Sequence, residues 1–307
     1  MELAPVALFV YNRPNHTRQT VEALQNNILA PESDLIIFSD GPKDSTESRE
    51  GVLAVREYLK TVSGFKSVRV VIRDKNNGLA NSIITGVTEV INQYGRIVVL
   101  EDDMISSKHF LQYMNEALSF YERDEKVISI HAYIYPVKKS LPETYFLKGA
   151  DCWGWATWKR GWDLFEADGQ KLLNELEDKK LTQEFDFSSS YPYTQMLEDQ
   201  IAGRNNSWAI RWYASAFLKN KLTLYPGQSL INNIGFDGSG THCGEITKID
   251  FVNDVDDIKI KVDAIKVVEN LEAKSVVINY LKEQTNLWTK GKQYLKRILR
   301  NIKIIKS

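Results

Sequence analysis

Three consecutive carboxylates, Glu101, Asp102 and Asp103, follow a short apolar run that ends at Leu100. Adjacent carboxylates repel one another, and a shared cation relieves that repulsion. Carboxylate oxygens suit Mg²⁺ or Mn²⁺, and the oxygens of a diphosphate can complete the coordination shell of such an ion. An acidic triplet can also be a solvated turn, so its place in the fold decides between the two interpretations.

The first hundred residues alternate between strand and helix patterns and give the triplet its structural context. Short apolar runs predict four strands, over 6–10, 35–38, 68–72 and 97–100. Apolar residues at helical spacing predict the intervening helices, over 16–26, 46–62 and 79–94. Strands separated by helices of this length form right-handed βαβ units and a parallel sheet. The fold class predicted from this pattern is α/β.

Polar residues follow each of the four predicted strands. They are Asn12 and Arg13, Asp40 and Gly41, Arg73 and Asp74, and the triplet that ends in Asp103. In an open parallel sheet, ligands bind in a crevice at the carboxyl ends of the strands. The triplet would therefore lie in a ligand crevice, and this context favours metal binding over a solvated turn.

The composition narrows the class of protein. A chain of 307 residues with 43% hydrophobic residues can form one large domain or two smaller ones. Its net charge of −1 offers no basic excess for nucleic acid. Two cysteines, no basic segment before the N-terminal apolar run and no apolar run of about 20 residues lead us to expect a cytoplasmic protein. The sequence contains no motif of P-loop NTPases, zincins or serine hydrolases.

Six short motifs occur in an order that resembles one known family. They are Tyr11-Asn12-Arg13-Pro14, Ser39-Asp40-Gly41, Asn76-Asn77-Gly78, Glu101-Asp102-Asp103, Trp153-Gly154-Trp155 and Gly238-Ser239-Gly240-Thr241-His242. Residues 3–245 resemble GT-A glycosyltransferases, in particular family 2-like bacterial sugar transferases and N-acetylglucosaminyltransferase I. The resemblance implies a GT-A fold, which is a Rossmann-like, mostly parallel central sheet flanked by helices. We expect a C-terminal helical tail after it.

The resemblance also implies roles for individual residues. Asp103 would bind Mn²⁺ or Mg²⁺, and His242 would be a second ligand of the metal or a contact of the diphosphate. The nucleotide sugar would be held by residues from the strand ends, namely Tyr11, Asn12, Arg13, Asp40, Arg73, Asn77, Gly78, Glu101 and Asp102. An inverting transfer needs a carboxylate that takes a proton from the acceptor. The resemblance points to Asp199, or to its neighbour Glu198.

Alternatives remain open at the acceptor side. A second alignment places the family's Asp-Asp-Trp segment on residues 206–208, which contain no carboxylate. Glu198 and Asp199 could equally lie on a solvated helix face. The sequence is therefore also compatible with a non-catalytic nucleotide-sugar-binding or scaffold protein that has the same fold. A sugar nucleotidyltransferase would need a glycine-rich basic loop near the N-terminus, which residues 12–14 resemble poorly.

The chain is expected to divide into a GT-A domain over 1–250 and an extension over 251–307. Within the domain, residues 1–105 would bind the nucleotide and residues 106–250 would shape the acceptor site. Segment 287–307 has seven basic residues, no acidic one and an amphipathic pattern. Such a helix could lie on the inner face of an anionic membrane, dock on a partner protein or remain exposed to solvent. The expected partners are a nucleotide-sugar donor, UDP-linked by default, and a glycan or lipid-linked acceptor, but no nucleic acid.

Overall fold

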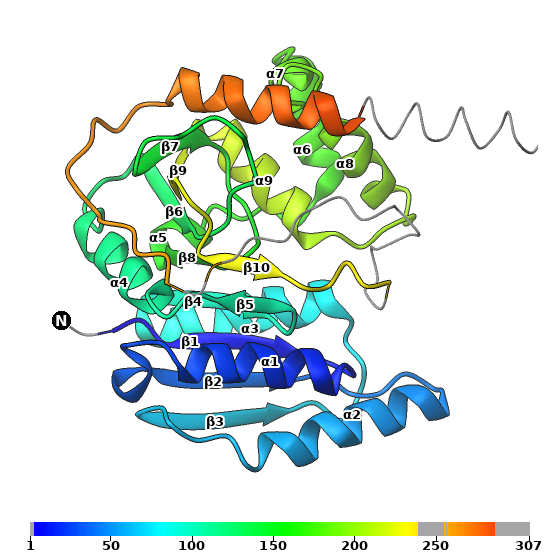
Figure 1. The fold of residues 1–307 in the computed structure, drawn as a ribbon. Coiled ribbons are helices and arrows are strands. Elements are labelled where there is room, and N and C mark those ends of the chain that lie inside the picture. The colour runs from blue at the N-terminus through cyan, green and yellow to red at the C-terminus, as the bar shows by residue number, and fades with distance from the viewer. Residues whose placement is uncertain (1–2, 239–254, 256, 286–307) are drawn as a thin grey trace, which may run out of the picture.

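The computed structural model describes residues 3–238, 255 and 257–285, and Figure 1 shows its ribbon. An eight-stranded central sheet has the order β3-β2-β1-β4-β8-β6-β9-β7. The strands are β1 (Val6–Val10), β2 (Asp34–Ser39), β3 (Ser67–Ile72), β4 (Arg96–Glu101), β6 (Val127–His131), β7 (Thr144–Lys148), β8 (Trp155–Trp158) and β9 (Leu222–Pro226). A second, small sheet pairs β5 (Met104–Ser106) with β10 (Ile231–Asn233) in the antiparallel direction.

Helices flank the central sheet. In chain order they are α1 (Pro14–Gln25), the short 3₁₀ helix η1 (Ala30–Glu32), α2 (Thr46–Leu59), α3 (Leu79–Tyr94), α4 (Phe110–Phe120), α5 (Lys159–Trp162), α6 (Gly169–Asp178), α7 (Thr182–Phe185), α8 (Tyr193–Ile201) and α9 (Trp208–Leu218). A further helix covers residues 271–285 and is drawn in orange to red in Figure 1.

The first half of the sheet is parallel and covered on both faces. Strands β3, β2, β1 and β4 all run in the same direction. Alternate residues of β1 enter different cores: Leu8 packs with Leu24 of α1 and Val55 of α2, whereas Phe9 packs with Ile83 of α3. A strand that is buried on both faces needs an unbroken apolar run, which explains the sequence of β1. The predicted mostly parallel sheet flanked by helices is confirmed.

The second half of the sheet is mixed in direction. Strand β8 runs antiparallel to β4 and to β6, and β7 runs antiparallel to β9. Because β6 lies antiparallel to β8 and parallel to β9, the carboxyl ends of β6 and β9 reach the same edge as those of β1 to β4. Six of the eight strands therefore end at one edge of the sheet.

Boundaries differ slightly from the predicted ones. Helix α1 begins at Pro14 rather than at residue 16, with proline in its first turn. Proline fits there because its φ is already helical and the first backbone N–H of a helix has no partner within it. Strands β2 and β4 each extend one residue further at both ends than the apolar run that predicted them.

The described part of the predicted extension packs on residues 106–250. Ala273, Val277 and Leu281 of the helix over 271–285 are buried in a cluster with residues of α6 and α9. Ile260 is buried in the cluster that also contains β6 and β9 residues. The basic segment 287–307 and His242 lie outside the described residues. Among the helices that the structure describes, none has the length and apolar character that crossing a membrane requires.

Candidate active site

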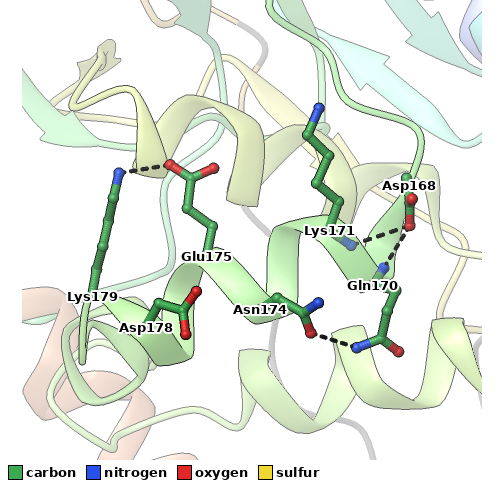
Figure 2. A pocket seen from close by; sticks show the side chains of 7 residues that line it. All are labelled: Asp168, Gln170, Lys171, Asn174, Glu175, Asp178 and Lys179. Atoms are coloured by element: carbon green, nitrogen blue, oxygen red, sulfur yellow. Dashed lines mark hydrogen bonds and ion pairs between the residues drawn. The ribbon is translucent and has the colours of Figure 1, made fainter.

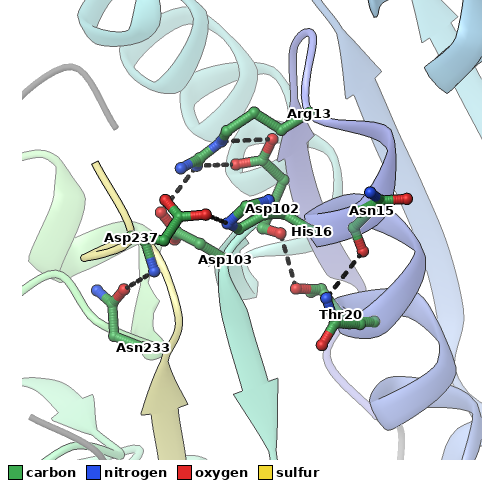
Figure 3. Close-up of polar contacts among 10 residues, drawn as sticks. Arg13, Asn15, His16, Thr20, Asp102, Asp103, Asn233 and Asp237 are labelled. Atoms are coloured by element: carbon green, nitrogen blue, oxygen red, sulfur yellow. Dashed lines mark hydrogen bonds and ion pairs between the residues drawn. The ribbon is translucent and has the colours of Figure 1, made fainter. Parts of the chain in front are cut away.

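The acidic triplet lies at the carboxyl edge of the central sheet. Glu101 ends β4, and Asp102 and Asp103 form the turn into β5. Because β5 pairs with β10, the chain after β10 returns to this turn, where the Ile234 N–H donates to the Asp103 carbonyl at 2.9 Å. Figure 3 shows the polar contacts that surround the triplet.

Arg13 compensates the charge of two members of the triplet. It follows β1 directly, and its Nη2 atom donates to Asp102 Oδ1 and to Asp103 Oδ2, the latter at 2.7 Å. Burial would lower the pKa of the guanidinium, but the charges of Asp102 and Asp103 raise it. Burial in turn raises the pKa of Asp102, against the effect of Arg13. The cationic group that stabilises these carboxylates is thus supplied by the chain itself.

Arg13 compensates the charge of Glu101 only in part. Burial first, and then the charges of Asp103 and Asp102, raise the pKa of its carboxyl group to about 8. A buried carboxyl group beside two carboxylates is more stable in the protonated form, because that form removes a repulsive charge.

Asp103 has the features that a single metal ligand needs. Its Oδ2 atom pairs with Arg13, whereas its Oδ1 atom is buried without a hydrogen-bond partner among the described residues. Within the same part of the chain, no cluster of three or more His, Cys, Asp or Glu side chains could enclose an ion. Mg²⁺ commonly binds through one or two carboxylates together with substrate phosphates and water. The residues at this edge fit a divalent ion whose remaining ligands come from a diphosphate.

Helix α1 adds further contacts to this edge. Thr20 donates through Oγ1 to the Asp102 carbonyl at 2.8 Å. His16 Nε2 lies 3.2 Å from Asp237 Oδ2, which joins the first turn of α1 to the segment after β10. His16 was not among the residues selected from the sequence. Its signal was its position at the start of the helix predicted over 16–26, two residues after the Tyr11-Asn12-Arg13-Pro14 motif.

Asp40 organises the neighbouring loop. Its Oδ1 atom accepts hydrogen bonds from the backbone N–H groups of Gly41 and Asn77, both at 2.9 Å. Its Oδ2 atom accepts from the Gly78 N–H at 3.0 Å and from Asn76 Nδ2 at 3.2 Å. Gly78 has a φ of 74° at the start of α3, a conformation that favours glycine. The predicted nucleotide contacts Asp40, Asn77 and Gly78 therefore form one hydrogen-bonded unit.

The other predicted nucleotide contacts lie at the ends of β1 and β3. The hydroxyl groups of Tyr11 and Ser48 are 2.5 Å apart, and the Lys43 N–H donates to the Tyr11 hydroxyl at 3.2 Å. Asn12 follows Tyr11 and packs its backbone carbonyl against Gly51 of α2. Arg73 Nη2 lies 3.4 Å from a carboxylate oxygen of Glu89 on α3. The structure brings all of these residues to the carboxyl edge, with Arg73 at its margin.

Asp199 and Glu198, the predicted bases, lie on α8. Asp199 Oδ1 accepts hydrogen bonds from Arg204 Nε at 2.8 Å, Arg204 Nη2 at 2.5 Å and Gln195 Nε2 at 3.1 Å. The hydrogen bond from Arg204 lowers the pKa of the Asp199 carboxyl group. Within the described part of the chain, its hydrogen bonds stay local to α8 and the loop that follows, and none reaches the acidic triplet.

A second carboxylate near the triplet was not selected from the sequence. Asp151 lies in the 149–154 loop, which joins β7 to β8. The charges of Asp151, Glu101 and Asp103 all act on the thiol of Cys152, whose pKa is raised chiefly by burial. Cys152 therefore lies within electrostatic reach of both Asp151 and the triplet. The sequence signal for Asp151 was its position two residues before the Trp153-Gly154-Trp155 motif.

A surface hollow of about 520 Å³ on α6 is unrelated to this edge. Figure 2 shows the seven side chains that line it. Lys179 pairs with Glu175 at 2.6 Å, and Asp168 caps the helix by accepting from the backbone N–H groups of Gln170 and Lys171. Charged groups that satisfy one another on an exposed helix indicate a solvated face rather than a binding site.

Comparisons with known proteins agree with this geometry. The family model described as Glycosyl transferase family 2 matches residues 6–161, just over half of the chain, from β1 into α5. None of the curated proteins matches the sequence closely enough to count as a relative.

Two solved structures illustrate the similarity to known folds. The mannosyltransferase PcManGT from Pyrobaculum calidifontis, in complex with GDP-Man and Mn²⁺, is 16% identical, with 44% of this chain and 39% of that chain covered and a TM-score of 0.33. Residues 1–349 of S. aureus TarS are 12% identical, with 74% of this chain and 59% of that chain covered and a TM-score of 0.41. This chain thus spans less than two thirds of either neighbour, and likeness at this level carries no argument about substrates.

Proposed function

Because the chain belongs to glycosyl transferase family 2, we propose that it is a metal-dependent, inverting glycosyltransferase. It would move a sugar from a nucleotide-sugar donor to a glycan or lipid-linked acceptor. Family membership agrees with the glycosyltransferase class predicted from the sequence, whereas the likeness to N-acetylglucosaminyltransferase I stays a prediction. The observation that carries the proposal is Asp103, whose buried Oδ1 atom has no hydrogen-bond partner among the described residues.

The donor would lie at the carboxyl edge of the parallel half, in residues 1–105. Asp103 would hold Mn²⁺ or Mg²⁺, and the bound ion would supply a positive charge that stabilises the departing nucleoside diphosphate. Arg13 keeps Asp102 and Asp103 at fixed positions and offsets their repulsion. Asp40 fixes the loop that leads into α3. Residues 106–250 would shape the acceptor site, with UDP as the default nucleotide of the donor.

The proton of the acceptor hydroxyl needs a base on the acceptor side. The family resemblance implies Asp199 or Glu198, and both remain proposals. Both residues lie on α8, where Asp199 forms an ion pair with Arg204.

The proposed function is tested by thermal unfolding with UDP, GDP, dTDP and CMP, each with and without Mn²⁺. A ligand at one hundred times its Kd adds about 2.7 kcal/mol of stability, so one nucleoside diphosphate should raise the Tm in the presence of Mn²⁺. Asp103→Ala should abolish that shift, whereas Asp178→Ala, which removes a carboxylate from the exposed face of α6, should retain it. If no nucleotide stabilises the wild-type protein, a scaffold role on the same fold is the better account.

A further inference from the structure

The 149–154 loop continues the carboxyl edge into the acceptor half. Strand β8 pairs antiparallel with β4, and Trp155 lies opposite Val99. The residues just before Trp155 therefore run beside Leu100 and Glu101, the last residues of β4. Strands β6 and β9 also end at this edge, with His131 and Tyr225 near their carboxyl ends.

Asp151 is the carboxylate that this loop brings to the edge. Its Oδ1 atom accepts a hydrogen bond from the Cys152 N–H at 2.8 Å, and its Oδ2 atom lies 3.6 Å from His131 Nε2. Its side chain is 34% exposed. Among the described residues, no lysine or arginine forms an ion pair with it. Asp151 thus keeps one carboxylate oxygen that solvent or a ligand can reach and that no cation neutralises.

The groups around Asp151 include buried polar atoms without partners. His131 is fully buried, and within the described residues neither of its ring nitrogens has a hydrogen-bond partner. The hydroxyl group of Tyr133 is likewise buried without a partner in that part of the chain. Burying a polar group without a hydrogen-bond partner is unfavourable. Two residues of this kind near one carboxylate indicate a place where a hydroxylated ligand completes the hydrogen bonds.

Several aromatic side chains lie within electrostatic reach of the same carboxylate. The charge of Asp151 raises the pKa of nearby tyrosines, although burial is the larger cause in each case; they are Tyr133, Tyr135, Tyr191, Tyr193 and Tyr225. The rings of Tyr133 and Trp153 lie 4.7 Å apart, edge to face. Trp153 also contacts Phe236, two residues after the segment beside Asp103. The aromatic wall therefore reaches the segment whose backbone is hydrogen-bonded to Asp103.

The loop that supplies two of these tyrosines has a strained backbone. Phe187, Ser188 and Ser189 have φ angles of 47°, 57° and 61°, which residues other than glycine seldom adopt. Such strain persists only where surrounding contacts enforce it, and it is concentrated at binding sites. The strained turn leads directly to Tyr191 and is held by the Thr285 hydroxyl, which donates to the Ser190 carbonyl at 3.2 Å.

We propose that Asp151 is the general base of the transfer and that the tyrosines around it bind the acceptor as a neutral sugar. This inference rests on the proposed function. The acceptor oxygen would form a bond to the anomeric carbon while the bond from that carbon to the diphosphate oxygen breaks. The electron pair leaves with the nucleoside diphosphate, and the acceptor proton passes to the reachable oxygen of Asp151.

The chemistry of the wall specifies the acceptor class. Tyrosine and tryptophan rings pack against the apolar C–H faces of sugars, and hydroxyl and imidazole groups pair with sugar hydroxyls. The wall consists of uncharged side chains, namely Tyr133, Tyr135, Tyr191, Tyr193, Tyr225 and Trp153. A neutral sugar therefore fits better than a phosphate group at the point of attack.

Asp151 and Asp199 can be compared by matched variants. The rate of sugar transfer is measured for Asp151→Asn and Asp199→Asn. The donors are UDP-glucose, UDP-N-acetylglucosamine and GDP-mannose, and the acceptors are the methyl glycosides of glucose, galactose, mannose and N-acetylglucosamine. Loss of a general base lowers kcat by about 10²–10⁴-fold. We expect that loss for Asp151→Asn, with unchanged affinity for the nucleoside diphosphate, and a smaller loss of kcat for Asp199→Asn. The reverse pattern overturns the proposal.

Tyr133→Phe provides a test that does not depend on Asp151→Asn folding. Because the Tyr133 hydroxyl is buried without a partner in the described structure, its removal should leave the Tm unchanged or raise it. The same variant should raise the KM for the methyl glycoside and weaken its saturation-transfer NMR signal. Unchanged KM and NMR signals contradict an acceptor site at the tyrosine wall. If the wild-type protein neither binds a nucleoside diphosphate nor consumes a donor, the proposed function has failed and Asp151 loses its role with it.

Discussion

The acidic triplet and Asp151 lie at one edge of the sheet, but their charges are compensated differently. Asp102 and Asp103 share the guanidinium of Arg13. Asp151 receives a backbone hydrogen bond from Cys152 and lies near the Cys152 thiol, the His131 ring and several tyrosines. A carboxylate that is paired with a cation is stable without a ligand, whereas one without a cation keeps lone pairs that can accept a proton or a hydrogen bond. The difference suits a binding role for the first centre and a proton-accepting role for the second.

The largest effect, a loss of turnover, is expected from a change in Asp103, one of the two carboxylates that pair with Arg13. Asp103→Ala removes the proposed metal ligand, and loss of the several kcal/mol that a metal contributes to catalysis corresponds to about a thousandfold in turnover. Turnover is measured over a range of Mn²⁺ concentrations for this variant and for Asp178→Ala, which should behave as wild type. Wild-type turnover in Asp103→Ala would remove the metal from the mechanism.

The next largest effect is expected from removal of Arg13, the cation that pairs with Asp102 and Asp103. Arg13→Met leaves Asp102 and Asp103 without their partner, and breaking a buried ion pair costs about 3 kcal/mol. Urea unfolding should show this loss, and Mn²⁺ should restore part of it by supplying another cation. Arg49→Met breaks the exposed pair with Asp44 and should cost less than about 1 kcal/mol. Equal losses in the two variants would refute the contrast between buried and exposed pairs.

A smaller effect is expected from His131. Burial lowers the pKa of its imidazole from the ordinary value of 6.5, so the unfolded chain binds a proton below pH 6.5 that the folded protein does not. This contribution to stability is complete above pH 6.5 and is lost as the pH falls, by at most about 1.4 kcal/mol per pH unit. Urea unfolding at pH 7.5 and 5.5 should show a smaller decrease for His131→Phe than for wild type. Identical decreases would mean that His131 is protonated in the folded protein.

The smallest effect is expected at α8. Arg204→Ala frees an exposed carboxylate of Asp199, and exposed ion pairs contribute little because water solvates both charges. The Tm and the rate of transfer should both stay at their wild-type values. A clear fall in the transfer rate would return Asp199 to the mechanism and weaken the case for Asp151.

Sequence patterns predicted the parallel half because its signals are local. An apolar run such as 97–100 and the helical spacing over 79–94 each identify an element without knowledge of its neighbours. The rule that ligands bind at the carboxyl ends of parallel strands then placed Asp103 at the edge. The pairing of Arg13 with Asp102 was not predicted, because it depends on how closely the ends of β1 and β4 approach each other.

The mixed half could not be derived in the same way. Strand β8 has only four residues, and its direction is set by pairing with strands more than twenty residues away in the sequence. Unless that pairing is known, the sequence does not show that Asp151 lies near the triplet. It also does not show that His131 lies near Asp151. Asp199 was selected on a motif alone, and a motif does not reveal that Arg204 occupies its carboxylate.

Strand β8 also has a consequence for the order of assembly. During synthesis, β1 to β4 are complete before residues 155–158 emerge, so the edge of β4 that β8 later covers has no partner. That edge includes Val98 and Val99, and an uncovered apolar edge strand can pair with other chains. A nascent chain arrested between residues 101 and 155 should therefore be the aggregation-prone species of this protein, and arrival of β8 ends that exposure.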